Sequence, residues 1–281
     1  MRAIAGKIAS RHELYHNNGL LINNWIRIFE KSEAHQVLED LLSFWAKSAA
    51  KPTILFVDEV DTLIGDTLIS LLRQVRSGYD TRPTNFPHSI ILCGVRDVRD
   101  YRIHSSSTKE VITGGSAFNI KAESLRLANF SKAQIEQLYQ QHTTATGQIF
   151  EEGILDLAWY YTEGQPWLVN ALAHEVTDRM RENRDRSRPI TVEAFEEAKE
   201  RLILRRDMHF DKLQKEQVKN VVTSLFSSEN IPNTASRSDL HYAIDFGVII
   251  KEIGKDMRVS NSIYQEVLSR EFTCVLQDFM T

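Results

Sequence analysis

Cysteine is almost absent from this sequence: only Cys93 and Cys274 occur among its 281 residues. They lie far apart in the chain, and Cys93 ends an apolar, strand-like run. Small secreted domains held together by disulfides need several paired cysteines, so the sequence does not belong to that class. A reduced compartment suits it better, and we predict a cytoplasmic protein.

Long apolar runs are missing too. No stretch approaches the ~20 apolar residues that span a bilayer, and the first residues, Met1 to Lys7, lack the apolar core of a secretion signal. The 34 Lys and Arg nearly balance the 38 Asp and Glu, which leaves a net charge of −4. We therefore expect no membrane anchor, no export and no general attraction to nucleic acid or anionic lipid.

The first part of the chain, residues 1–128, is expected to be an α/β core. Residues 1–50 have helical periodicity, which Lys51 and Pro52 end. Two short apolar strands, Thr53–Val57 and Ser89–Cys93, flank a helical pattern over Thr67–Val75. A strand, a helix and a second strand in this order form a parallel unit of the α/β class.

The middle part, residues 129–207, is expected to be an all-helical domain. Before it, still within the first part, a polar segment from His104 to Ser116 predicts a loop, and Ala117–Ile120 predicts a short strand. Four helices are then predicted, beginning at Ser131, near Glu151, at Pro166 and at Thr191. The Arg-rich turn Arg179–Arg188 is interpreted as a solvated surface connection rather than a phosphate-binding site, because Glu182 and Asp185 interrupt its arginines.

The last part, residues 208–281, combines helical runs with a predicted hairpin. Val248–Ile250 and Met257–Val259 have strand character, and Gly254 lies in the turn between them. Two or three helices with one hairpin suggest a winged helix.

Two carboxylates follow the first predicted strand. The carboxyl ends of parallel strands face the ligand crevice, so Asp58 is placed where it can hold a metal ion beside phosphates. The next residue, Glu59, is placed to orient or deprotonate an attacking water. An acidic turn between a strand and a helix would contain the same residues, and this alternative stays open.

Three arginines at three-residue spacing follow the second predicted strand, on one helical face or turn. Arg96 is the nearest to the strand and is our candidate for neutralising charge on a γ-phosphate. For Arg99 and Arg102 we prefer ion pairing with Asp97 and Asp100.

The sequence lacks the loop that should accompany such carboxylates. No Gly-x-x-x-x-Gly-Lys-Ser/Thr segment occurs in it. The backbone amides and the lysine of that loop make most of the phosphate contacts in enzymes of this type.

Several segments resemble the bacterial AAA-like ATP-binding proteins, which are relatives of the STAND and Orc/Cdc6-type P-loop ATPases. The resemblance spans about residues 35–275 and is carried by Leu55–Leu63, Leu92–Arg102, Ala117–Lys121, Gly164–Asn170 and Asn261–Val267. It implies ATP and Mg²⁺ as cofactors. It also implies that Asp58 and Glu59 are the Walker B pair, that Cys93–Arg96 is the sensor 1 region, and that Gly164-x-Pro166 is a lid motif over adenine.

The resemblance further implies that a phosphate-loop strand lies between the sensor strand and the last strand. We expect that Met1 is an internal start, a truncated reading frame or the start of a degenerate gene. Without that strand, apolar strand faces should be exposed and the domain unstable alone. The expected function is therefore that of an AAA-like ATPase in a truncated or degenerate form that is inactive alone.

The alternative is a non-hydrolysing module that binds protein or DNA through the winged helix. Residues 209–281 contain eight Lys or Arg and ten Asp or Glu, a local charge of −2. Basic surfaces normally accompany DNA binding, so a protein partner or docking within the molecule is preferred.

Overall fold

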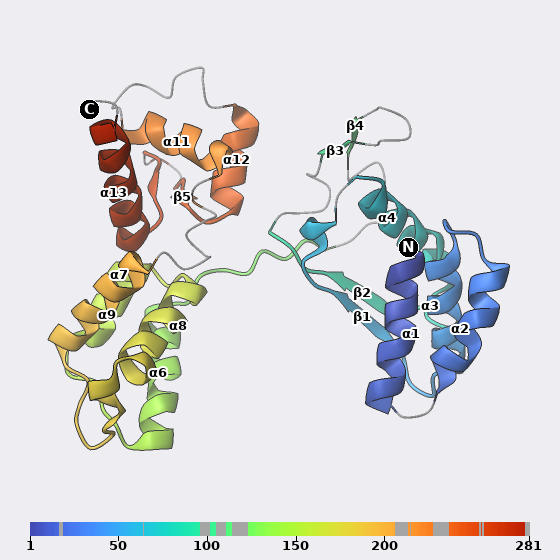
Figure 1. Cartoon of the computed structure of the whole chain (residues 1–281), viewed down its shortest axis with the longest axis horizontal. Helices are drawn as coiled ribbons and strands as arrows, with labels where there is room; N and C mark the ends of the chain where they lie inside the picture. Colours follow the sequence, from blue (N-terminus) through green and yellow to red (C-terminus); the bar gives the residue numbers. More distant parts are fainter. Residues whose placement is uncertain are drawn as a thin grey trace. The chain divides into compact units, whose positions relative to one another are not determined.

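The computed structural model describes residues 1–16, 19–63, 65–95, 102–104, 111–113, 123–205, 213, 215–226, 236–252, 254 and 256–278. It divides into two compact units, Met1–Leu125 and Arg126–Thr281 (Figure 1). Among the described residues, no helix is long and apolar enough to cross a membrane. The finer division into three domains, at 128/129 and 207/208, stays a prediction.

The first unit is a helical layer beside two parallel strands. The two strands, the helix between them and the helical character of residues 1–50 were predicted, and all are confirmed; the division of that range into three helices was not predicted. Strand β1 pairs with β2 in a register that places Ile54 beside Ser89 and Phe56 beside Ile91. The elements are α1 (Arg2–His16), α2 (Leu20–Lys31), α3 (Val37–Ser48), β1 (Ile54–Val57), η1 (Val60–Thr62), α4 (Asp66–Ser77), η2 (Tyr79–Thr81) and β2 (Ser89–Leu92).

One face of the strand pair packs on the core of this unit and the other face is uncovered. Leu55, Val57, Ile90 and Leu92 contact the buried cluster supplied by α1 to α4. On the opposite face, Ile54 is 51% exposed, Phe56 66% and Ile91 41%. Parallel strands are normally covered on both faces. The predicted exposure of apolar strand residues is confirmed for these three.

A buried glutamine joins helices α3 and α4. The first backbone amides of a helix have no partner within the helix, and an oxygen from elsewhere usually accepts from them. In α3 the acceptor is Oε1 of Gln74, which lies 2.8 Å from the amide nitrogen of Leu38. The Nε2 of Gln74 donates to Ser70 Oγ at 2.9 Å. Gln74 is only 2% exposed, so α4 fixes the beginning of α3 from inside the core.

Two short strands correct the predicted loop. β3 (Arg102–His104) and β4 (Val111–Thr113) pair antiparallel, with Ile103 beside Ile112. The prediction of a loop over 104–116 is wrong for His104 and for Val111–Thr113, and the helical spacing proposed for the arginines is wrong for Arg102. β-Branched residues in both segments favour the extended backbone. The predicted strand 117–120 lies outside the described residues.

The second unit begins with the four predicted helices. Ser131 and Gln134 form the expected capping box, and Pro166 occupies a first-turn position. The second helix begins a few residues later than predicted, after Gly153 at φ 94°. The elements are α6 (Lys132–Thr146), α7 (Ile154–Thr162), α8 (Pro166–His174), the π-helical turn η4 (Glu175–Arg179), η5 (Arg181–Arg184) and α9 (Val192–Leu204).

The rest of this unit contains the predicted hairpin. β5 (Ile249–Ile250) pairs antiparallel with β6 (Arg258–Val259), between α12 (Arg237–Asp245) and α13 (Ser262–Asp278). Helix α11 (Glu216–Phe226) precedes them. One apolar cluster runs through the whole unit, from Ile135 in α6 to Leu268 in α13. The hairpin is confirmed, whereas the winged-helix interpretation stays a prediction.

Candidate functional site

Asp58 and Glu59 lie between the end of β1 and the turn η1, and both are exposed. The hydrogen bonds between the two strands continue past the strand ends at this point. Cys93 N donates to Val57 O at 2.8 Å, and Val60 N donates to Cys93 O at 3.0 Å. The residue after β2 is therefore bonded to the residues on both sides of the two carboxylates, as the sequence predicted for neighbouring parallel strands.

Glu59 has a left-handed backbone, with φ 50° and ψ 40°. Three hydrogen bonds hold this conformation. Its amide donates to Asp58 Oδ1 at 2.9 Å, and its carbonyl accepts from the amide and the hydroxyl of Thr62, at 2.9 and 2.8 Å. Such backbone in a residue other than glycine costs on the order of 1–3 kcal/mol and is concentrated at functional sites. The functional role of the acidic pair stays a prediction.

Asp58 fits Mg²⁺ as a single protein ligand. Mg²⁺ is usually bound by one or two carboxylates, with phosphate oxygens and water as the remaining ligands. One oxygen of Asp58 accepts from Glu59, which leaves the other for a cation. No group of three or more His, Cys, Asp or Glu side chains in the described part of the chain could hold a metal by itself. A cation at Asp58 would therefore depend on a bound nucleotide for most of its ligands.

The predicted sensor region is described only in part. Cys93 is a free, half-buried cysteine, and the following Gly94 and Val95 are exposed. Arg96 lies outside the described residues, so its role stays a prediction.

Tight packing explains the Gly164-x-Pro166 motif without a ligand. Gly164 has φ 77°, and a Cβ atom added there would lie 1.9 Å from the carbonyl oxygen of Phe130. Gln165 then caps α8, because Leu168 N donates to its Oε1 at 2.6 Å. Pro166 and the acidic pair belong to different units, so the predicted adenine contact of Pro166 stays a prediction.

No protein-family model matches the sequence, and no curated protein matches it. Among solved structures, the chain is similar to a Walker-type ATPase of Pyrococcus abyssi, with a TM-score of 0.53 and 16% sequence identity. The match covers 85% of this chain and 69% of that chain. The chain has a P-loop ATPase-like fold. At this identity the likeness shows the fold alone, so the relationship to STAND or Orc/Cdc6-type proteins stays a prediction.

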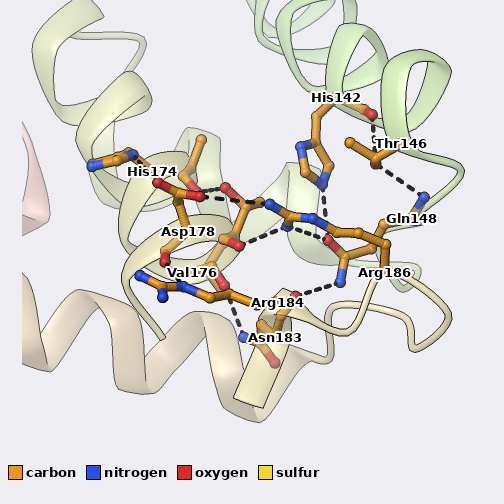
Figure 2. A network of polar contacts seen from close by, with 11 residues as sticks. His142, Thr146, Gln148, His174, Val176, Asp178, Asn183, Arg184 and Arg186 are labelled. Carbon is orange, nitrogen blue, oxygen red and sulfur yellow. Dashed lines mark hydrogen bonds and ion pairs between the residues drawn. The ribbon is translucent and has the colours of Figure 1, made fainter. Parts of the chain in front are cut away.

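The arginine-rich turn has a structural role in this ATPase-like fold. Gln148, 1% exposed, is the centre of a polar network that Figure 2 shows. Arg186 Nη1 donates to Gln148 Oε1 at 2.9 Å and to Thr177 O at 2.6 Å. Gln148 Nε2 donates to the carbonyls of Asn183 and Arg188, at 2.9 and 3.0 Å. These contacts hold the turn against the ends of α6 and α8, which supports a surface connection over a phosphate site.

Sequence reasoning missed an open groove in the second unit. Its volume is about 550 Å³, and aromatic side chains of α7 and apolar side chains near β6 line it together with Leu225. An ion pair between Glu163 and Arg258 lies in its lining. These two residues are 95 positions apart, so no local pattern in the sequence could have indicated the pair.

Proposed function

We propose that this chain is an ATPase-like protein whose acidic pair, Asp58 and Glu59, is one half of an ATP site, and that these 281 residues alone do not hydrolyse ATP. The position of the pair supports this proposal. It follows a parallel strand in a P-loop ATPase-like fold, and Cys93, the residue after the neighbouring strand, is hydrogen-bonded to Val57 and Val60 on either side of it. The absence of a phosphate loop from the sequence supports the proposal that these residues alone do not hydrolyse ATP.

The proposed roles follow from charge and position. Asp58 would hold Mg²⁺ on a nucleotide, where the cation neutralises phosphate charge. Glu59 would orient the water that attacks the γ-phosphate, Arg96 would respond to that phosphate, and Pro166 would approach adenine. In a complete site, hydrolysis would drive a conformational change between the units.

The uncovered strand face supports an incomplete site. Phe56 is two residues before Asp58 and is largely exposed, together with Ile54 and Ile91. A segment that covered these three side chains would bury apolar surface and would also approach the carboxylates.

Nucleotide titration and a phosphate-release assay of the purified chain test the proposal. We expect no binding of fluorescent ATP at micromolar concentration and no turnover above that of Glu59→Gln. Binding at micromolar affinity or tighter would contradict the proposal.

We propose, as a second candidate, a non-hydrolysing module that binds a protein through α11, α12, the hairpin and α13. The order of these elements favours it, because helices followed by a hairpin are what a winged-helix-like module requires. The local charge of −2 over residues 209–281 disfavours DNA. A salt-dependent gel shift with random duplex DNA would reverse this preference for protein over DNA.

A further inference from the structure

The turn between α7 and α8 is bonded to the segment through which the chain enters the second unit. Asn129 Nδ2 donates to Glu163 O at 3.1 Å, and Phe130 N donates to Gly164 O at 2.8 Å. Glu163 and Gly164 both have left-handed backbone, with φ 43° and φ 77°. The two carbonyls that accept from the entry segment therefore belong to consecutive residues of one left-handed turn.

The side chain of Glu163 is bonded in turn to the C-terminal hairpin. Both oxygens of its carboxylate accept from Arg258 in β6, at 2.7 Å from Nη1 and 2.8 Å from Nη2. Two parallel bonds fix the orientation of both groups, unlike a single contact between charges. Glu252 lies 3.6 Å from the same guanidinium. Glu163 thus joins the entry segment, through its backbone, to the hairpin, through its carboxylate.

A second contact connects the entry segment to the same region. Arg126 Nη2 donates to Ile244 O at 3.0 Å, near the end of α12. Helix α12 contacts β5, and Val248 N donates to Ala243 O at 3.0 Å. Residues 126–130 are therefore bonded to both sides of the hairpin, directly at α12 and through Glu163 at β6.

The groove lies where these contacts meet. Trp159 and Tyr160 of α7 line it together with Met257 and Val259, and Glu163 and Arg258 belong to the same lining. Separation of Glu163 from Arg258 would remove this polar contact between the end of α7 and the hairpin and would widen the groove.

We propose that the Glu163–Arg258 pair couples the entry segment, residues 126–130, to the C-terminal hairpin. Displacement of the entry segment moves the backbone of Glu163, separates its carboxylate from Arg258 and releases the hairpin. The source of that displacement, a conformational change in the first unit, rests on the proposed function. The coupling itself is a property of the second unit and needs no nucleotide.

Amide hydrogen exchange of the full-length protein, measured without nucleotide, tests the coupling. In Arg258→Gln and in Glu163→Gln, exchange of the hairpin amides, Val248–Ile250 and Met257–Ser260, should rise about two- to fivefold, the range that a surface ion pair supports. The matched control is Arg270→Gln, which removes ion pairs of Arg270 with Glu200 and Glu266 and leaves the hairpin pair intact. It should leave hairpin exchange unchanged.

Asn129→Ala distinguishes coupling from a local contact, because the side chain of Asn129 donates to Glu163 and, within the described part of the chain, not to the hairpin. It should raise hairpin exchange in the same direction, and its effect should largely disappear in the Arg258→Gln background.

The exchanged pair, Glu163→Arg with Arg258→Glu, should restore protection in part. Exchange in α6 reports general unfolding and should stay constant in every variant. Unchanged hairpin exchange in Asn129→Ala, or full additivity with Arg258→Gln, would overturn the proposal. ATPase measurements do not enter this test, so its failure is separate from failure of the proposed function.

Discussion

Replacement of Gly164 by alanine should destabilise the second unit far more than replacement of Gly147. The two glycines have nearly the same φ, 77° and 76°. An alanine in this region costs about 1–2 kcal/mol by itself. At Gly147 an added Cβ meets no atom within 4 Å, so this is the whole expected cost.

At Gly164 the added Cβ would lie 1.9 Å from Phe130 O and 2.9 Å from Phe130 C. Backbone atoms must move by more than 1 Å to relieve such an overlap. That movement breaks the bond from Phe130 N to Gly164 O, whose loss costs about 0.5–1.5 kcal/mol or more if the groups stay buried. We expect Gly164→Ala to lower the free energy of unfolding by about 1.5–3.5 kcal/mol in total, and by more if the separated groups stay buried.

Urea unfolding followed by tryptophan fluorescence measures this difference. In a background with Trp25→Phe and Trp45→Phe, the remaining Trp159 and Trp167 report only the second unit. Equal losses of stability in the two alanine variants would refute the steric argument. The motif would then need another explanation, such as a contact with a ligand.

Two further predictions concern the packing of each unit. Gln74→Ala leaves the buried amide of Leu38 without its acceptor and should destabilise the first unit by about 1–3 kcal/mol. The control is Arg73→Ala, at an exposed position on the same helix, which should cost less than about 0.5 kcal/mol. Equal effects of the two substitutions in urea unfolding would contradict the capping role. Hydrogen bonds from Lys199 and Arg270 hold the pKa of Glu200 below its ordinary value of 4.5. Because the pKa is lowered in the folded state, the stabilisation is present above that ordinary value and is lost as the pH falls through the folded pKa. Glu200→Gln should therefore lower the stability by less than about 1 kcal/mol at pH 7, since the carboxylate is partly exposed. The difference in stability between the variant and the unchanged protein should vanish in strong acid. A difference in thermal unfolding that grows as the pH falls would contradict the lowered pKa of Glu200.

Local signals in the sequence predicted much of the fold. Periodicity, the Pro166 start and the Ser131–Gln134 capping box indicate the helices because each signal acts within a few residues. The two strands and their parallel order follow from the same kind of pattern. The loop predicted over 104–116 was partly wrong because three β-branched or apolar residues were outweighed by the polar residues around them.

Contacts between distant residues could not be predicted. Gln74 accepts from an amide 36 residues earlier in the chain, and Glu163 pairs with Arg258 at a separation of 95 residues. Neither polar side chain stands out in its own segment. The acidic pair could be predicted because it directly follows an apolar strand, whereas the left-handed backbone of Glu59 has no signal in the sequence.

ATP turnover by the purified 281-residue chain tests the central claim most directly. Phosphate release would be measured with excess Mg²⁺ and ATP for the chain and for Glu59→Gln. We predict that the two rates are equal and no higher than that of a blank without protein. Turnover above the blank that is abolished by Glu59→Gln would show that the acidic pair acts in a complete site, and would contradict the proposal that these residues alone do not hydrolyse ATP.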